Sequence, residues 1–450
     1  MRQPRLRGGR GLGHLPGRLP ADIACGNGVC EPGETVFSCL ADCALGTCGN
    51  HVCEPGEENG GCDVDCFLDL CGNGVCELSE STASCEVDCP ATRQADVLFV
   101  IDSSGSMAEE QARIAEQFPS LYAAIRSALH EMPDLHVGVV TTDLGTGQFP
   151  ITYCSQGGDA GALVPLRGDG GAPAQPYLVD VTPVGCGEVR DATGTCTAHA
   201  CGADACAAEP GTTVVIDDET GCPRCRNVAA RPVDVFQATA QVGNTGCGFE
   251  QPLEAMVRAL DGNPANAGFL RPDALLAVIV LTDEDDCSAK DDTLFDTTQS
   301  DPGSPLGPLT SFRCFEFGVT CDVNDRITMG ERHACQPRSD AGALLHPVQR
   351  YVDFLTALKD PGRIAVTVIG GPVTDYTVTV GPSEYDGPEL QPSCESQSGS
   401  AYPAVRLQSF AAHFNPPSGM SDSFVSICAD SYADALQSTG QLLEKRLTFR

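Results

Sequence analysis

The chain has 450 residues, which is enough for more than one folded unit with a substantial core. Its 61 acidic residues outnumber 27 lysines and arginines, and the formal net charge is −34. An acidic field of this size repels nucleic acid and anionic lipid surfaces, which argues against both as partners. The sequence has no apolar stretch long enough to cross a bilayer, so we expect no membrane-spanning segment.

Cysteine is the strongest signal in the composition, with 26 residues distributed along the whole chain. Cytosolic proteins rarely carry so many thiols outside metal sites, whereas oxidising compartments convert them into disulfides. We therefore expect an extracellular or cell-envelope protein. Residues 1–24 contain five arginines and no apolar segment of the signal-peptide type. No secretion signal is evident, and we expect this segment to be basic and disordered.

Residues 25–90 contain three copies of one four-cysteine pattern, which begin 23 residues apart. The first copy starts Cys25-Gly-Asn-Gly-Val-Cys30 and ends with Cys39 and Cys43. A unit this short cannot bury a useful hydrophobic core, so we expect two disulfides in each repeat. The repeats resemble short Cys-Gly-Asn-Gly-type units of secreted proteins, where such units act as spacers or binding modules. The cysteines of the other two copies are Cys48, Cys53, Cys62, Cys66, Cys71, Cys76, Cys85 and Cys89.

Asparagine and acidic residues recur at fixed places in the repeats, as at Asn27, Glu31, Glu34 and Asp42 of the first copy. Oxygen ligands in a cross-linked loop could coordinate calcium. The same residues could instead solvate a disulfide-bonded knot and cap its turns. The absence of an EF-hand spacing favours this second interpretation, and the cysteine spacing is uncommon among zinc sites.

From residue 94 onward, short apolar runs alternate with amphipathic stretches. The runs are continuous, as in strands that are buried on both faces of a parallel sheet. Between the first two runs, Ile114, Phe118 and Leu121 begin an apolar stripe that predicts a helix, and Pro119 predicts a kink or two abutting helices. The alternation predicts an α/β fold with a doubly wound, mostly parallel sheet over 94–450. The predicted strands are 97–101, 135–140, 275–281 and 364–369, and the further predicted helices are 249–261, 346–359, 404–414 and 429–446.

Two segments, at about 144–234 and 284–345, fit this alternation poorly and are rich in cysteine. Structureless loops of such length are uncommon, so we interpret both as disulfide-reinforced insertions that crowd the metal-binding end of the sheet. Cys222-Pro-Arg-Cys225 could be a redox pair or half of a zinc site, but structural disulfides are favoured because no thioredoxin-like context surrounds it. Cys394 and Cys428 could form a disulfide near the C-terminus.

Polar residues follow the first predicted strand directly, in the pattern Asp102-x-Ser104-x-Ser106. In an open α/β sheet, ligands bind beyond the carboxyl ends of the strands, where this loop falls. One carboxylate and two hydroxyls can face a hard divalent cation, although Asp and Ser also begin helices simply as caps. The strand 275–281 runs into Thr282-Asp283, which places a second carboxylate at the end of a strand that we expect beside the first.

The motifs Val-Leu-Phe-Val-Ile-Asp102-x-Ser104-x-Ser106 and Val-Ile-Val-Leu-Thr282-Asp283 resemble the two signature loops of von Willebrand factor A (VWA) domains, which have a Rossmann-like fold. The resemblance covers about residues 95–446 outside the insertions and implies a metal-ion-dependent adhesion site (MIDAS). In such a site Asp102, Ser104 and Ser106 contact a divalent cation, and Asp283 binds it directly or through water. The implied ion is Mg²⁺, with Ca²⁺ or Mn²⁺ as alternatives. The implied partner is a protein that offers an acidic side chain to an open coordination position.

One ligand departs from the VWA pattern. These domains usually supply a threonine from a loop ahead of a middle helix, but here Glu250 falls near that place, with Thr245 as the alternative. An extra carboxylate would strengthen cation binding and weaken the attraction of the cation for an acidic partner, so the site could be chiefly structural. Cys247 and Cys287 flank the two loops and could be bonded to each other.

Two other classes of function compete with an adhesive binding protein. A secreted enzyme would need an unrecognised site, because the sequence has no His-Glu-x-x-His, Gly-x-Ser-x-Gly or phosphate-loop motif. An intracellular VWA protein is disfavoured by the 26 cysteines. We therefore expect a non-enzymatic protein that binds a protein ligand through a cation.

Overall fold

A computed structural model describes residues 92–127, 132–168, 173–383, 387–396, 399–414 and 423–447, together with Cys76, Cys85, Val87 and Asp88. The chain divides into two compact units, residues 1–74 and 75–450, and every described residue belongs to the second. The expected N-terminal disorder and the first two cysteine repeats therefore lie outside the described residues. Of the third repeat, Cys76 and Cys85 are described, and both are disulfide-bonded.

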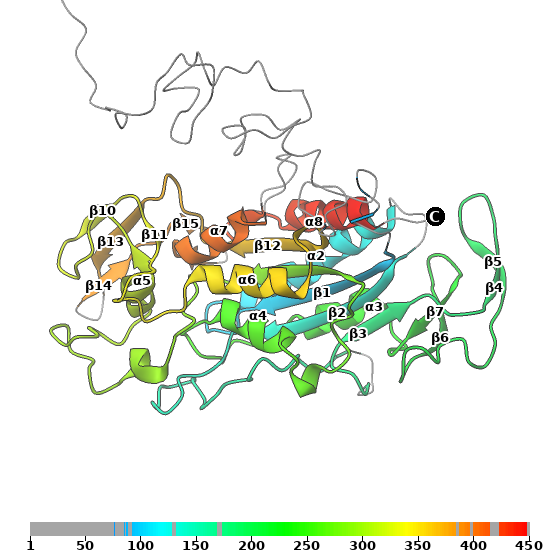
Figure 1. Cartoon of the computed structure of the whole chain (residues 1–450), viewed down its shortest axis with the longest axis horizontal. Helices are drawn as coiled ribbons and strands as arrows, with labels where there is room; N and C mark the ends of the chain where they lie inside the picture. Colours follow the sequence, from blue (N-terminus) through cyan, green and yellow to red (C-terminus); the bar gives the residue numbers. More distant parts are fainter. Residues whose placement is uncertain are drawn as a thin grey trace, which may run out of the picture. The chain divides into compact units, whose positions relative to one another are not determined.

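An eight-stranded sheet forms the centre of the second unit (Figure 1), in the order β17-β12-β8-β1-β2-β3-β7-β6. The first five strands of that order run parallel, and the last three are antiparallel to their neighbours. The four predicted apolar runs are β1, β2, β8 and β12, which confirms the mostly parallel sheet. The strands are β1 (Gln94–Ile101), β2 (Asp134–Thr141), β3 (Leu178–Val181), β6 (Thr213–Ile216), β7 (Pro223–Arg226), β8 (Leu275–Leu281), β12 (Ile364–Gly370) and β17 (Phe424–Ser426).

Helices cover both faces of the sheet (Figure 1), because each central strand is apolar on both sides. In β1, Val97 and Phe99 pack into one core with α2, α3 and α8, whereas Leu98 and Val100 pack into the other with α4, α6 and α7. The predicted α/β class is thereby confirmed. The helices are α2 (Ala108–Ser127), α3 (Pro232–Thr239), α4 (Pro252–Leu260), α6 (Val348–Leu358), α7 (Val405–Ala412) and α8 (Ala433–Arg446).

Pro119 lies inside α2, which continues through it as one helix. The alternative of two abutting helices is therefore wrong. Proline removes one backbone hydrogen bond from a helix interior, but the apolar stripe around it is buried: Phe118 stacks on Phe236 of α3 at 3.8 Å between ring centroids, and Leu121 is also buried. Tertiary packing of this stripe offsets the local penalty.

The first cysteine-rich segment contributes β3, β6 and β7 to the edge of the main sheet, beside β2. Because β3 runs antiparallel to β2 and pairs Asp180 with Leu135, most of this extension lies toward the amino ends of the parallel strands. The expectation that the whole segment crowds the metal-binding end is therefore wrong, since only its beginning lies there. A separate hairpin, β4 (Gly187–Arg190) and β5 (Cys196–Ala200), projects from the extension (Figure 1).

The second cysteine-rich segment forms one helix, α5 (Phe312–Gly318), a 3₁₀ turn at Asp292–Phe295 and three short strands, β9 (Val319–Thr320), β10 (Gly330–Arg332) and β11 (Gln336–Pro337). β9 pairs with β11 inside the segment, whereas β10 pairs with β13 (Val378–Pro382), which in turn pairs with β14 (Pro388–Leu390). The remaining short elements lie outside the segment: the pair β15 (Cys394–Glu395) and β16 (Ser400–Ala401), and 3₁₀ turns at Pro264–Asn266 and Pro361–Arg363.

Seven disulfides with described partners join loops of this unit. Cys222 and Cys225 belong to two different bridges, with Cys196 and Cys206, which confirms their structural role. The suggested bond between Cys247 and Cys287 is wrong, because each bonds elsewhere. The other bridges are Cys154–Cys247, Cys186–Cys201, Cys287–Cys314, Cys321–Cys335 and Cys394–Cys428, the last as predicted.

Among the helices that the structure describes, none is long and apolar enough to span a membrane.

Candidate cation site

The site is built where β1 and β8 end side by side. The two strands are parallel neighbours, and Ile101 pairs with Leu281, so Asp102 follows one strand as Thr282 follows the other. The Asp102 backbone N–H donates to the carbonyl of Leu281 at 3.0 Å. Its carboxylate accepts from the Thr282 hydroxyl at 2.8 Å and from the Ser104 backbone N–H at 2.7 Å. Asp102 is thus completely buried and held by neutral donors from both loops.

The hydroxyls of the first loop lie next to the second carboxylate. Ser104 Oγ and Ser106 Oγ are 3.3 Å apart, and the Ser106 hydroxyl donates to Asp283. One carboxylate oxygen of Asp283, Oδ1, is buried and has no hydrogen-bond partner within the described part of the chain. Gly105 and Ser106 are exposed, so this side of the site reaches solvent.

The third loop brings Glu250 to the site, and it also brings Gly246, next to Thr245, onto the first loop, where the Gly246 N–H donates to the Ser103 carbonyl at 2.8 Å. Glu250 is 1% exposed, and its carbonyl accepts from the Cys287 N–H at 2.8 Å. Its carboxyl group is hydrogen-bonded with Glu284, which also contacts the Ser311 side chain. Thr245 is exposed. We call the four side chains that meet here the acid cluster: Asp102, Glu250, Asp283 and Glu284.

Electrostatics of the acid cluster are dominated by burial and by the repulsion of like charges. Burial, with the charge of Asp283 added, raises the pKa of Asp102 to about 7. Burial and the charges of Asp283 and Asp102 raise the pKa of Glu284 to about 8. The pKa of Glu250 is raised well above its usual range by burial and then by Glu284, and burial also raises the pKa of Asp283. The contributions that lower these pKa values are mainly hydrogen bonds and not basic side chains of the described residues. Ionised carboxylates at this place would therefore be stabilised by a bound cation.

Sequence reasoning predicted neither Glu284 nor a fifth acid, Glu110, as part of the site. Glu110, in the first turn of α2, is 6% exposed, and its Oε2 has no partner among the residues described. Burial raises the pKa of Glu110, and the charge of Asp283 adds to the effect. Acidic residues are common in the first turn of any helix because they complement its dipole, so no sequence signal could have identified it.

The structure also separates the acidic run Asp283–Asp286 into two pairs. Asp285 accepts hydrogen bonds from the N–H groups of Arg406 and Leu407 and so caps the start of α7. Asp286 pairs with the Arg406 guanidinium at 2.8 Å, with both side chains fully buried. This second pair is structural, and only Asp283 and Glu284 belong to the acid cluster.

The donor set fits a hard divalent cation. Carboxylates and hydroxyls are the ligands of Mg²⁺ and Ca²⁺, and the unpartnered Asp283 Oδ1 is a buried acceptor of the kind a cation satisfies. No three carboxylates of the acid cluster have oxygens within 4.8 Å of one another, so the serine hydroxyls would have to supply part of the ligand set. Among the described residues, one group of three acids, histidines or cysteines meets this spacing: Glu188, Cys196 and Cys222. Its two cysteines are bonded to each other in a disulfide and cannot bind a metal ion.

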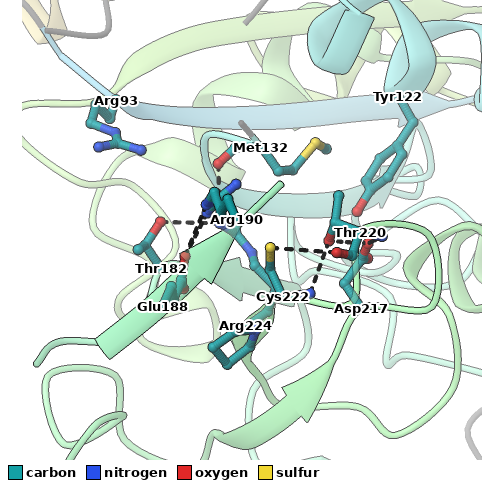
Figure 2. A pocket seen from close by; sticks show the side chains of 11 residues that line it. Arg93, Tyr122, Met132, Thr182, Glu188, Arg190, Asp217, Thr220, Cys222 and Arg224 are labelled. Carbon is teal, nitrogen blue, oxygen red and sulfur yellow. Dashed lines mark hydrogen bonds and ion pairs between the residues drawn. The ribbon is translucent and has the colours of Figure 1, made fainter. Parts of the chain in front are cut away.

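A pocket lies away from this site, at the amino ends of β1 and β2 (Figure 2). Three arginines line it, but they do not make it an anion site. Arg224 uses all five guanidinium donors, including one to Asp180 at 2.7 Å, and Arg190 donates to Glu188 and to the Gly194 carbonyl. The pocket is therefore part of the bonding that holds the antiparallel extension to the sheet.

Comparisons with protein-family models, with curated proteins and with solved structures found no match for this chain. What the fold and the site define is an α/β, disulfide-rich protein with a buried acid cluster at the carboxyl ends of two neighbouring parallel strands. Any narrower class has to be proposed from these features.

Proposed function

We propose that this protein is a VWA-type binding protein that acts outside the cytoplasm and uses a divalent cation at the acid cluster to hold a protein ligand. The observation that carries the proposal is the meeting of the Asp102 and Asp283 loops at the ends of adjacent parallel strands, with a buried Asp283 oxygen that has no partner among the described residues. Ligand binding beyond the carboxyl ends of such strands is the general rule for open α/β sheets.

The cation would be held by the carboxylates of Asp102 and Asp283 and by the hydroxyls of Ser104 and Ser106. It would supply positive charge that the side chains of this site lack. The side of the site that reaches solvent, at Gly105 and Ser106, is where an Asp or Glu of a partner would approach. Without a cation, a chain with a net charge of −34 would repel that ligand.

The disulfides support a location outside the cytoplasm. Sixteen described cysteines are disulfide-bonded, and reducing compartments rarely allow this number. Together with the finding on the described helices, they fit a secreted or cell-envelope protein.

A second candidate function is a purely structural cation that fastens the three loops together without contacting a partner. It is favoured by the depth of the acid cluster, since Asp102 and Glu250 are 0% and 1% exposed. The two candidates agree on the cation and differ in whether a ligand completes its coordination.

The test uses the full oxidised chain and an array of peptides that differ in the position of a single Asp or Glu. We expect retention of a subset of acidic peptides in the presence of divalent cation, loss of retention in EDTA, and loss with Asp102→Asn. The matched control is Asp301→Asn, the same change at an exposed position outside the site. Cation binding without any cation-dependent peptide retention would favour the structural candidate, and retention that is insensitive to both EDTA and Asp102→Asn would contradict the proposed function.

A further inference from the structure

Asp102 lies between two threonines at the ends of the neighbouring strands. Thr142 follows β2 and Thr282 follows β8 directly, as Asp102 follows β1. At each of these positions the backbone N–H donates to a carbonyl at the end of the adjacent parallel strand, at 3.3 Å for Thr142, 3.0 Å for Asp102 and 3.2 Å for Thr282. The three residues therefore occupy equivalent places at three successive strand ends.

The alternation of side chains along a strand places all three on the same face of the sheet. Val100 and Val140, two residues before Asp102 and Thr142, both pack into the core with α4, α6 and α7. On the other side, the Thr282 hydroxyl donates to the Asp102 carboxylate at 2.8 Å. Because neighbouring strands are about 4.8 Å apart, the Thr142 hydroxyl is a near neighbour of the same carboxylate.

The two threonines differ in how their hydroxyls are satisfied. Thr282 is bonded to Asp102, whereas Thr142 is 0% exposed and its Oγ1 has no hydrogen-bond partner among the described residues. The backbone of Thr142 is fixed on both sides, by the bond of its N–H to β1 and by its carbonyl, which accepts from the Gln251 N–H at 3.1 Å. A buried hydroxyl without a partner is unfavourable, and the fold holds this one beside a buried carboxylate.

A divalent cation bound at Asp102 would give this hydroxyl a partner. Serine and threonine hydroxyls bind hard cations through an oxygen lone pair. Since metal–oxygen distances are about 2.0–2.6 Å, one ion joins oxygens that are too far apart to hydrogen-bond to each other. A hydroxyl also adds no negative charge, so it completes the coordination without weakening the attraction of the cation for an acidic ligand.

We propose that Thr142 Oγ1 is a ligand of the cation at Asp102. The inference rests on the proposed function in needing a cation there, and it adds a ligand from a third strand that the sequence pattern did not indicate. In the sheet, β2 and β8 lie on opposite sides of β1. Thr142 would therefore hold the ion from the side opposite to the Asp283 loop, and the site would extend over three strand ends.

The experiment is isothermal titration of the full oxidised chain with CaCl₂ and, separately, with MgCl₂. Because the cysteine repeats also carry acids, the signal of this site is defined as the part that is lost in Asp102→Asn. Thr142→Val keeps the shape of the side chain and removes the hydroxyl, and it should reduce the affinity for both ions by about tenfold or more. Thr142→Ser keeps the hydroxyl and should bind both ions nearly as tightly as the natural chain.

Two matched variants make the same change elsewhere. Thr213→Val lies on the exposed edge strand β6 and should leave both affinities unchanged. Thr245→Val tests the exposed threonine of the third loop, which is the competing candidate. A loss of affinity in Thr245→Val that Thr142→Val does not show would assign the role to Thr245 and overturn the inference.

Thermal unfolding in EDTA distinguishes a cation ligand from a hydroxyl that merely supports the fold. Because Thr142 Oγ1 has no partner among the described residues, Thr142→Val should unfold at the same temperature as the natural chain or higher. Thr282→Val, which loses the bond to Asp102, should unfold at a lower temperature.

Two results would overturn the inference while the proposed function stands. One is unchanged affinity for both ions in Thr142→Val, as expected if only a water contacts the hydroxyl. The other is a fall in the unfolding temperature of Thr142→Val in EDTA as large as that of Thr282→Val. If neither ion produces a signal that Asp102→Asn removes, the proposed function fails as well.

Discussion

Asp102 is a buried carboxylate whose hydrogen-bond donors are all neutral and whose charged neighbours are other acids. Asp180, in the antiparallel extension, is equally buried but lies between two arginines, Arg224 at 2.7 Å and Arg226 at 3.2 Å. The two pKa values are shifted in opposite directions: burial raises the pKa of Asp102, whereas the same burial at Asp180 is outweighed by the charges of Arg224 and Arg226, which lower its pKa. Among the described residues, no basic side chain neutralises Asp102, whereas two arginines neutralise Asp180.

Asp102→Asn should therefore have opposite effects with and without cation. In EDTA at pH 8 the variant should be as stable as the natural chain or more stable, because asparagine keeps the shape and removes a buried charge. In saturating calcium the natural chain should gain about 2.7 kcal/mol at a hundredfold excess over Kd, and the variant should gain almost none from this site. Thermal unfolding in both conditions measures this, and equal calcium-induced shifts for both proteins would contradict it.

Asp180→Asn should destabilise the fold in all conditions. Its removal leaves Arg224 and Arg226 buried without their shared carboxylate, which is expected to lower the free energy of unfolding by about 3–5 kcal/mol. Asp234→Asn is the control, since its pair with Arg231 is largely exposed and screened by solvent and should contribute little to stability. Urea denaturation measures the free energy of unfolding of each variant. Similar losses for both variants would show that the buried network contributes no more than a surface pair.

At the scale of elements, the loop that carries Glu250 is positioned by the disulfide between Cys154 and Cys247. Replacing both cysteines by alanine should lower calcium affinity by about tenfold, because a loosened supporting shell no longer holds its ligand, and should lower stability by about 2–4 kcal/mol. Replacing Cys186 and Cys201, which close a hairpin far from the site along the sheet, should lower stability but leave calcium affinity unchanged. Equal affinities in the two double variants would mean that the disulfide has no part in building the site.

The central elements could be predicted from the sequence because their signal is long and unambiguous. The apolar run of β8 is buried on both faces over its whole length, and Asp283 follows it directly. The edge strand β6 gives no such signal, since its valine and isoleucine residues are largely exposed and it is held by pairing with β7. Its position, like the bond of Cys247 to Cys154, is decided by tertiary contacts that leave no local pattern.

The same distinction applies to the candidate site. Asp102 and Asp283 could be placed together because parallel strands end at one edge of a sheet. The choice between Glu250 and Thr245 could not be made, since it depends on how the loop before α4 is fixed by Cys154, a residue nearly a hundred positions away. Glu284 and Asp285 are chemically alike in the sequence, and only the position of α7 separates a candidate ligand from a helix cap.

At the scale of the whole molecule, the unneutralised acids should make stability depend on pH. The folded state raises the pKa of Asp102 to about 7 and that of Glu284 to about 8, whereas unfolded carboxyl groups titrate near 4. Between these values the folded state binds more protons than the unfolded state, so the cation-free protein should lose stability as pH rises from about 4 to about 8. Urea denaturation in EDTA at pH 5 and pH 8 measures this slope, and saturating calcium should reduce it. The double variant Asp102→Asn, Glu284→Gln should have a smaller dependence of unfolding free energy on pH. If its dependence equals that of the natural chain, other groups cause it.

The disulfides also concern the whole molecule, because their number indicates the compartment in which the protein is located. Peptide mapping of the unreduced protein should recover the seven described pairs, among them Cys154–Cys247 and Cys287–Cys314. Alkylation before reduction should label none of the sixteen bonded cysteines. Extensive labelling in freshly isolated protein would contradict a location outside the cytoplasm.

The most direct measurement is anomalous diffraction from crystals of the oxidised protein grown with MnCl₂, a substitute for either magnesium or calcium at oxygen ligands. We expect a manganese peak bonded to Asp102, with Asp283 Oδ1 and the hydroxyls of Ser104 and Ser106 turned toward it, and no peak there in Asp102→Asn. An ordered acid cluster that stays empty while manganese binds elsewhere would contradict it.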